Sequence, residues 1–218
     1  MLNTTTSGGD AFVRLAVLFV LIVGFQVLVS RITLETEAKR RWQHALTGHI
    51  LVQASYILPM KLGTVGLILG AIGLAYLRFG HPEKFVEVFG PLLRREELEP
   101  GTLPGAFYFL VGTAMTTIFF DLPTARYAVE CLALADPMAA FCGKSVSSPK
   151  INERSSVAGC LGCFSMACAI GYIMLPHASA FQIFLGALAC TVAESTPIGN
   201  DNLTIPLFTA AVVTWSRS

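Results

Sequence analysis

The sequence predicts an all-α polytopic membrane protein, a bundle of seven to eight transmembrane helices with one short interfacial helix. Of its 218 residues, 54% are hydrophobic and 13% are charged, whereas roughly a quarter of the residues in soluble domains are charged. The mean hydropathy is +0.64. Several windows of about 18 mostly apolar residues occur, which is the length that crosses a hydrocarbon core of roughly 30 Å. We therefore expect one integral membrane domain over residues 1–218, with a disordered tail at residues 1–10.

The apolar runs define the expected spans. In order, they are 12–29, 45–59, 62–77, 106–120, 127–141, 157–175, 180–193 and, as a shorter eighth run, 203–215. A charged connector, 31–41, follows the first run, and its Glu35 and Lys39 are spaced as on one exposed helix face. The third run contains four glycines, Gly63, Gly66, Gly70 and Gly73. Small residues let transmembrane helices approach closely, so we expect close helix packing there.

The longest polar stretch, 78–104, contains the expected interfacial helix. Its apolar residues Phe85, Val88, Phe89 and Leu92 recur near helical spacing beside charged residues, which is typical of a helix that lies in the membrane surface. The six cysteines lie in or at the ends of apolar runs, and Cys160-x-x-Cys163 has no second such pair, so we expect packed thiols and no zinc site. The N-terminal residues predict neither a cleavable signal nor a transit peptide.

The charges favour one side of the predicted bundle. If eight spans alternate, the connectors 30–43, 78–104, 142–155 and 194–202 lie on the same side. They carry eleven of the 15 Lys and Arg residues, while Arg14, Lys61, Arg126 and Arg217 lie on the other side. The positive-inside rule places the first set in the cytoplasm.

The candidate site lies on that cytoplasmic side. Asp136 sits inside an apolar run, Gly143-Lys144 follows it, and a polar loop then carries Lys150 and Arg154. A carboxylate can hold Mg²⁺ together with substrate phosphates, and a lysine offers a point charge for phosphate. The opposing interpretations are a helix-end acid paired with a lysine, and lysines that simply flank a span.

Three further polar clusters fall at the same predicted face. Glu194, Asp201 and Asn202 lie between the last two apolar runs, where a carboxylate could bind a metal or act as a base; Gly, Asn and Asp there also suit a plain turn. The other two clusters are Arg41 with His44, and Arg94 with Arg95. His44 could bind phosphate or relay a proton, and the Arg94-Arg95-Glu96-Glu97 run could contact lipid headgroups or form mutual ion pairs.

Glu130 stands apart from these clusters. It lies well inside the fifth run, where an acid needs a partner or a role. The sequence names neither for it, and we interpret His49 as structural.

In four places the sequence resembles the CTP-dependent lipid-alcohol kinases (dolichol kinase, fungal-type diacylglycerol kinase and phytol kinase), distant relatives of the phosphatidate cytidylyltransferases. The matching segments are Lys39-Arg40-Arg41-Trp42-Gln43-His44 with Gly48; Arg94 through Pro104-Gly105 to Gly112; Ala135-Asp136 with Gly143-Lys144 and Ser155-Ser156-Val157-Ala158-Gly159; and Glu194 with Asp201-Asn202 to Pro206. The family has Gly where this chain has Ala135, and Lys where it has Ser155. Lys150 or Arg154 would then substitute for that basic residue.

The resemblance implies phosphoryl transfer from CTP to the hydroxyl of a membrane lipid alcohol such as diacylglycerol, dolichol, another polyprenol or phytol. Asp136 and Asp201 would hold Mg²⁺ or another divalent cation, with Glu194 as a further catalytic carboxylate. Gly143, Lys144, Lys150, Arg154, Asn202, Arg41 and His44 would bind the nucleotide phosphates, and Arg94 and Arg95 the lipid headgroup. The endoplasmic reticulum is the membrane implied, with a plastid membrane as the alternative, and no nucleic-acid partner is expected.

Three alternatives stay open. A cytidylyltransferase would make a CDP-lipid from CTP and release diphosphate instead of CDP. A transporter would place several ionisable residues near span midpoints and show inverted repeats, but the sequence shows no repeat and only Glu130 lies well inside a span. A non-catalytic membrane protein is the third alternative. Neither the lipid nor the oligomeric state follows from the residues.

Overall fold

The structure is a computed structural model that describes residues 8–31, 36–196 and 198–217. Within these residues every regular element is a helix and no strand occurs, which confirms the predicted all-α class. The elements are α1 Gly8–Arg31, α2 Thr36–Ala54, α3 Met60–Gly80, α4 Pro82–Phe89, the 3₁₀ turn η1 Gly90–Leu92, α5 Arg95–Leu98, α6 Gly105–Phe119, α7 Leu122–Glu130, the π-helical turn η2 Cys131–Ala135, α8 Asp136–Ser145, α9 Val157–Met174, α10 Ala180–Ser195 and α11 Asp201–Trp215.

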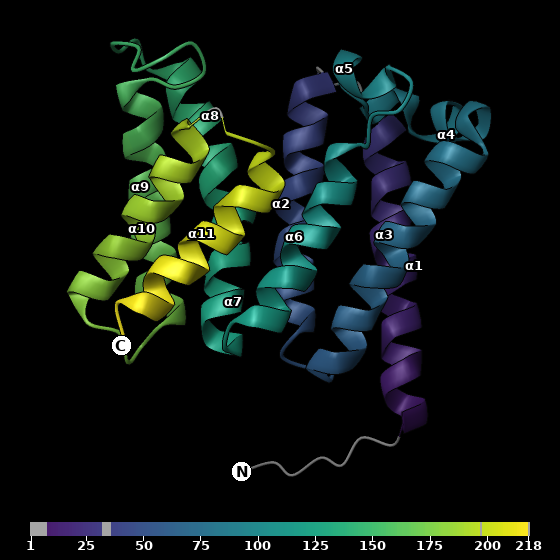
Figure 1. The fold of residues 1–218 in the computed structure, drawn as a ribbon, viewed down its shortest axis with the longest axis horizontal. Coiled ribbons are helices and arrows are strands. Elements are labelled where there is room, and N and C mark those ends of the chain that lie inside the picture. The colour runs from purple at the N-terminus through teal and green to yellow at the C-terminus, as the bar shows by residue number, and fades with distance from the viewer. Residues whose placement is uncertain (1–7, 32–35, 197, 218) are drawn as a thin grey trace.

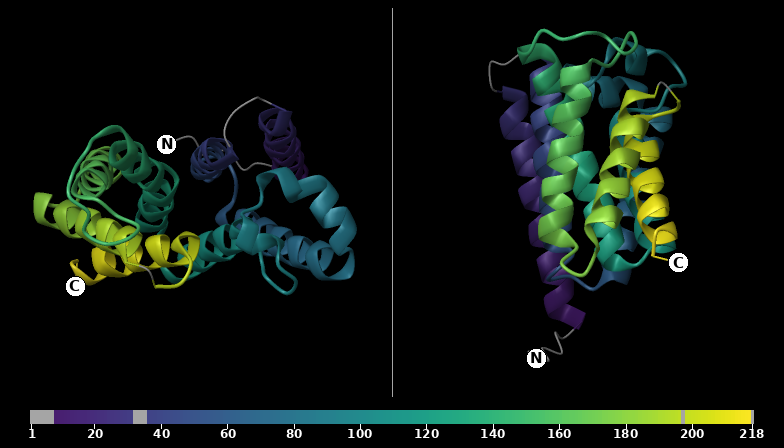
Figure 2. Two further views of the ribbon diagram at one scale, coloured as in Figure 1. Left: turned by 90° about the horizontal axis from the view of Figure 1, so that it is seen from above. Right: turned by 90° about the vertical axis from the view of Figure 1, so that its left-hand side faces the viewer.

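The long helices run side by side and alternate in direction (Figure 1). The helices α4 and α5 and the loop 146–156 lie at the upper end in Figure 1, while α1 begins and α11 ends toward the lower end. Seen from above, α1 to α6 form one half of the molecule and α7 to α11 the other (Figure 2). The halves meet where α6 contacts α11 and where α2 contacts η2.

Two helices are long and apolar enough to cross a membrane, namely α3 with 21 residues and α9 with 18. The helices α6 and α10 are apolar but shorter. The expected interfacial helix corresponds to α4. The number of spans, seven to eight, stays a prediction.

Several boundaries differ from those predicted. The helix α2 begins at Thr36, so Lys39, Arg40 and Arg41 belong to a helix that the sequence placed after the charged connector. The predicted pair of Glu35 with Lys39 involves Glu35, which lies outside the described residues. Of the predicted tail, residues 1–7 also lie outside the described residues, and Gly8–Asp10 form the start of α1.

The fifth predicted span is one rod made of α7, η2 and α8. The Asp136 amide donates to the Cys131 carbonyl, five residues back, and this bond defines the π-helical turn. Pro137 follows at once, and a proline cannot donate a backbone hydrogen bond and disturbs the preceding turn. The helix is therefore distorted on the N-terminal side of the proline.

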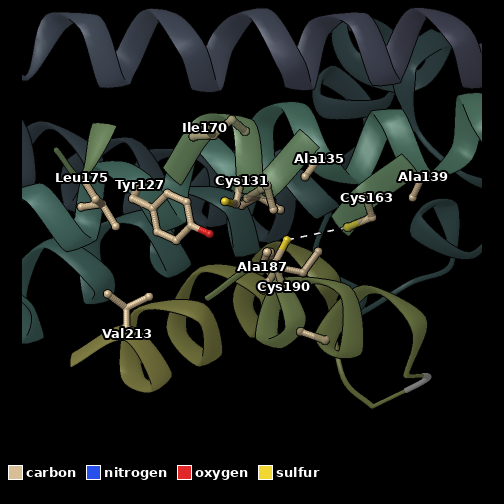
Figure 3. Close-up of a cluster of buried hydrophobic side chains, with 14 of the residues drawn as sticks. Tyr127, Cys131, Ala135, Ala139, Cys163, Ile170, Leu175, Ala187, Cys190 and Val213 are labelled. Atoms are coloured by element: carbon tan, nitrogen blue, oxygen red, sulfur yellow. Dashed lines mark hydrogen bonds between the residues drawn. The ribbon is translucent and has the colours of Figure 1, made fainter. Parts of the chain in front are cut away.

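The buried core lies between this rod and α9, α10 and α11 (Figure 3). Tyr127 is fully buried in it, and its ring packs where Cβ atoms at Gly171 and Gly186 would stand, at 3.2 and 3.0 Å from ring carbons. The thiols of Cys131, Cys163 and Cys190 are buried beside it, with the sulfurs of Cys163 and Cys190 3.8 Å apart. Small residues thus bring these helices close around one large ring.

At three of the four glycines of α3 the close packing that we predicted is absent. A Cβ added at Gly63 or Gly73 would meet no atom within 4 Å, and one at Gly70 would make only an ordinary contact, 3.5 Å, with Leu110. The close approaches lie elsewhere. A Cβ at Gly48 would be 2.6 Å from the Cβ of Ala133, and one at Gly112 would overlap the carbonyl oxygen of Asn202. Gly48 and Gly112 therefore bring the two halves of the molecule together.

We expect Gly112→Ala to destabilise the protein by about 1–3 kcal/mol, because the new methyl group would push α6 away from the α11 backbone. Gly73→Ala is the matched control, since its methyl group enters open space and the helix gains about 0.5–1 kcal/mol of propensity. Thermal unfolding of the purified proteins in one detergent measures both. Equal melting temperatures for the two variants would contradict this account of the contact.

Candidate active site

A cavity of about 1160 Å³ runs along the bundle and is lined by residues of α1, α2, α3, α6, the α7–α8 rod and the ends of α10 and α11. Its end at the upper edge of Figure 1 is charged, and we call the following lining residues the polar rim: Arg41, Arg94, Asp136, Lys144, Lys150, Arg154, Glu194 and Asp201. Below the polar rim the lining is mostly apolar, with leucines and glycines of α3 on one wall.

The predicted site residues therefore converge. Of the twelve that we named from the sequence, eleven line this cavity, including Gly143, Asn202 and His44 in addition to the polar rim. Arg95 does not line it and is exposed. Its predicted role in headgroup binding stays a prediction.

Three carboxylates from separate elements meet at the polar rim. Asp136 begins α8, Glu194 lies near the end of α10, and Asp201 begins α11. One oxygen of Glu194, Oε2, and one of Asp201, Oδ1, are buried without a hydrogen-bond partner. Buried carboxylate oxygens are normally satisfied, so this part of the rim is suited to an incoming donor or cation.

The pKa of Glu194 is raised to about 7, mainly by burial and also by the charges of Asp136 and Asp201, against the opposing effect of Arg154 and Arg41. Burial also raises the pKa of Asp201, which Arg154 lowers in part. The acids at the rim thus compete for the same positive charges.

The main cationic contact is made by Arg154, whose guanidinium donates to Asp201 Oδ2 at 2.6 Å. Asn152 holds the loop that carries this arginine: its Oδ1 accepts from the Arg154 and Ser155 amides, and its Nδ2 donates to the Ser195 carbonyl at 2.7 Å. The loop is thereby tied to the end of α10. Lys144 and Lys150 are exposed at the rim, where a soluble ligand can reach them.

The first amides of α9 are already bonded. The Val157 amide donates to the Pro149 carbonyl, the Ala158 amide to Ser148 Oγ, and the Gly159 amide to Ser156 Oγ. This helix end therefore offers few free donors to an anion, and phosphate would have to be bound by side chains.

His44 and Arg41 come from α2. The pKa of His44 is lowered to about 4, mainly by burial and also by the positive charge of Arg41, against the opposing effect of a backbone hydrogen bond at Leu132. The ring meets Phe109 edge-on with centroids 4.9 Å apart, and its Nε2 is buried without a partner. A neutral imidazole can make one hydrogen bond to a ligand but adds no charge against phosphate. Glu37, which the sequence did not single out, contacts Arg41 at 2.9 Å.

The loop 94–105 is held by contacts that the sequence did not reveal. Buried Arg78 donates to the carbonyls of Thr102, Glu97 and Glu99. Glu97 accepts from the amides of Arg94 and Gly105, at 2.8 and 2.6 Å. Arg94 is thereby fixed at the rim.

The amide group of Asn202 donates to the Gly105 carbonyl at 2.9 Å. Its Nδ2 therefore positions α11 against α6, although the side chain was predicted to bind the nucleotide.

Glu130 has a partner in the structure. Its Oε1 lies 2.5 Å from Nδ1 of His49, and its Oε2 is buried and unpartnered. Neither residue lines the cavity. The pair ties α2 to α7, in keeping with the structural interpretation of His49.

No group of three or more His, Cys, Asp or Glu residues is placed to hold a metal ion among the described residues. Mg²⁺ needs no such cage, because it binds through one or two carboxylates together with substrate phosphates. The unpartnered Oδ1 of Asp201 fits a cation that arrives with a nucleotide.

The chain is similar in sequence to a known plant enzyme. The chain is 26% identical over 220 residues to phytol kinase 1, chloroplastic, of Arabidopsis thaliana, an alignment that covers 88% of this chain and 70% of that protein. No protein-family model matches the chain, and no solved structure matches it. The similarity to the phytol kinase extends over most of the chain that builds the cavity.

Proposed function

We propose that the protein is a membrane-embedded kinase that transfers a phosphoryl group from a nucleoside triphosphate to the hydroxyl of a lipid alcohol. The observation that carries the proposal is the two-part cavity, which is charged at one end and apolar along its length. A soluble nucleotide can reach the charged end, and a lipid can lie in the apolar part. The similarity to a phytol kinase supports the same class of reaction.

The polar rim suits the donor phosphates. Phosphoryl transfer depends mainly on positioning and on neutralising the charge of the transferred group. Lys144 and Lys150 are exposed at the rim, and Arg41 and Arg94 line it. In this proposal they bind the triphosphate as it enters.

Arg154 changes partner on nucleotide binding in this proposal. It donates to Asp201 in the free protein. The planar guanidinium can bind a phosphate in the same bidentate way as it binds a carboxylate. When Arg154 turns to phosphate, Asp201 becomes available as a cation ligand together with Asp136. A bound Mg²⁺ would supply charge neutralisation on the phosphates.

Glu194 is the carboxylate best suited to accept the proton of the lipid hydroxyl. Its raised pKa of about 7 is close to that of an efficient general base at neutral pH. Its Oε2 is buried and unpartnered, so a hydroxyl can donate to it without displacing another group.

The sequence resemblance supplies the finer parts of the proposal. We propose CTP as the donor, a bundle of seven to eight spans with the polar rim on the cytoplasmic side, and the endoplasmic reticulum as the membrane. A plastid membrane is the alternative for the last point, and the Arabidopsis relative is named as chloroplastic.

We expect purified protein to transfer labelled phosphate from CTP and Mg²⁺ to a lipid alcohol, with diacylglycerol, a polyprenol and phytol as acceptors and ATP as the competing donor. Asp136→Asn and Asp201→Asn should each lower kcat by about 100-fold or more, because each removes a carboxylate that would hold the cation on the phosphates. Glu153→Gln, at an exposed loop residue outside the cavity lining, is the control and should retain activity.

The nucleotide product separates the proposal from its rival. Release of CDP with a phosphorylated alcohol supports the kinase, whereas release of diphosphate with a CDP-lipid identifies a cytidylyltransferase. Full activity of Asp136→Asn would overturn the proposed site.

The raised pKa of Glu194 also predicts how stability depends on pH. The ordinary value is 4.5 and the folded value is about 7, so between these values the folded state binds more protons than the unfolded state. The free energy of unfolding therefore falls as pH rises through this window, and Glu194 adds no further pH dependence above it. Glu194→Gln removes this dependence, so the variant should gain stability relative to the wild type between about pH 5 and about pH 8.

Thermal unfolding without nucleotide or metal, in one detergent at both pH values, measures the difference. Glu153→Gln is the matched control because Glu153 is exposed in the loop and lies outside the cavity lining. A melting difference between Glu194→Gln and the wild type that stays the same at both pH values would refute the assignment.

A further inference from the structure

The four glycines of α3 form one wall of the apolar part of the cavity. Gly63, Gly66, Gly70 and Gly73 all line it, and their spacing of three, four and three residues places them on one side of the helix. We call them the glycine face. Interior helical glycines are unfavourable, so a face of four needs a compensating reason.

Helix contact is not that reason at the two ends of the glycine face. A Cβ at Gly63 or at Gly73 would meet no atom within 4 Å, although both positions line the cavity. The absence of side chains there leaves space empty, in contrast to Gly48 and Gly112, where a neighbouring helix fills it. The glycine face therefore hollows the bundle.

The hollow is deep. The lining of α3 extends from Leu77 to Met60, which corresponds to about 25 Å along the helix at 1.5 Å per residue. One leaflet of the hydrocarbon core is about 15 Å thick, half of roughly 30 Å. The cavity is therefore long enough to take a chain that reaches beyond the middle of a bilayer.

The far end of the cavity is bounded by a fixed arginine. Arg126 donates to the hydroxyl and the carbonyl of Ser55 at 2.7 and 2.6 Å, and its guanidinium lies 3.6 Å from the centroid of the Tyr56 ring. Ser55 and Arg126 both line the cavity. The space thus begins at the polar rim and ends at a group held in place by three contacts.

A second observation indicates that the space holds a ligand. Thr113 of α6 lines the cavity, is 4% exposed, and its hydroxyl is buried without a hydrogen-bond partner. Thr116 and Thr117 of the same helix bond to backbone carbonyls at 2.7 and 2.8 Å. An unsatisfied buried hydroxyl beside a large cavity is expected where something enters the cavity.

We infer that the hydrocarbon chain of the substrate alcohol lies inside the protein along the glycine face, and that Gly63 and Gly73 set the length of chain that is accepted. This inference rests on the proposed function for the position of the hydroxyl, which lies at the polar rim. The chain then runs past Gly73 first and Gly63 last, toward Arg126. Gly63 and Gly73 are specificity-determining residues because any side chain there would shorten the space.

The test compares transfer to straight-chain primary alcohols of increasing length in the wild type, Gly63→Phe and Gly73→Phe. Gly63→Phe should lower kcat/KM for the longest alcohols by about tenfold or more, because the new ring and the end of the chain would compete for the same space. The kcat/KM for short alcohols should stay unchanged. Gly73→Phe should move the limit to shorter chains, because it lies about 15 Å nearer the rim. Gly24→Phe is the matched control, since Gly24 is exposed with nothing within 4 Å and does not line the cavity.

A graded series, Gly63→Ala, Gly63→Leu and Gly63→Phe, guards against misfolding, because a length limit should fall step by step with side-chain size. Equal losses for all alcohols in a variant that melts normally would overturn the inference, as would an unchanged profile in both phenylalanine variants.

A binding measurement separates this inference from the proposed function. A long-chain alcohol with a photoreactive group at its methyl end, added without nucleotide, should label residues near the far end of the cavity, such as Leu58 and Leu67, and Gly63→Phe should remove that labelling. Such labelling without transfer from any nucleotide would refute the kinase and leave the chain site standing. Transfer with labelling confined to Ile68 and Ile72, which are exposed outside the cavity, would refute the chain site and leave the kinase standing.

Discussion

The balance of charge at the polar rim is the constraint on which the rest of the structure depends. Asp136, Glu194 and Asp201 come from three helix ends, and the negative charge of Asp136 raises the pKa of both Glu194 and Asp201. Like charges in a partly buried place are tolerated only when cations stand near them, and Arg154 and Arg41 meet this need. The loop 146–156 and the start of α2 are therefore held where they are by electrostatics as well as by packing. When a nucleotide binds with its metal ion, the metal ion would take over the neutralisation of the carboxylates, and the arginines would neutralise the phosphates.

Backbone contacts between the two halves hold the rim together. At Gly112 the α11 backbone reaches α6, and at Gly48 the α2 backbone reaches the π-helical turn. Asn202 adds a side-chain bond from α11 to Gly105 in the same region. These contacts lie between halves that otherwise enclose open space, so the protein combines close approach at a few points with a cavity of about 1160 Å³ beside them. Rigidity near the rim and space behind it are both needed for a charged donor to meet an apolar acceptor.

Much of the fold and the grouping of the site residues could be predicted from the sequence. Hydropathy alone locates most of the helices. The alternation of the spans then predicts that Asp136, Lys144 and Asp201 lie at one end of the bundle, and the bias of lysine and arginine toward alternate connectors indicates the same end. What lies opposite a residue could not be predicted, because spacing shows only which side of a helix a residue occupies. The glycines of α3 were therefore assigned to packing when they face a cavity, and the His49 partner of Glu130 and the three bonds of Arg78 were not foreseen. Each of these depends on contacts between segments distant in the chain.

The polarity of α2 bears on how such a protein is made. This helix contributes Arg41 and His44 to the cavity and holds Glu130 through His49, so its most useful side chains are those least compatible with hydrocarbon. Charged and polar residues disfavour the insertion of an isolated segment during synthesis, whereas the neighbouring α3 is apolar enough to insert alone. In a bilayer α2 would have to insert together with α3, as a helical hairpin. The polar side chains that the cavity needs are therefore the ones that make insertion of these nineteen residues unfavourable.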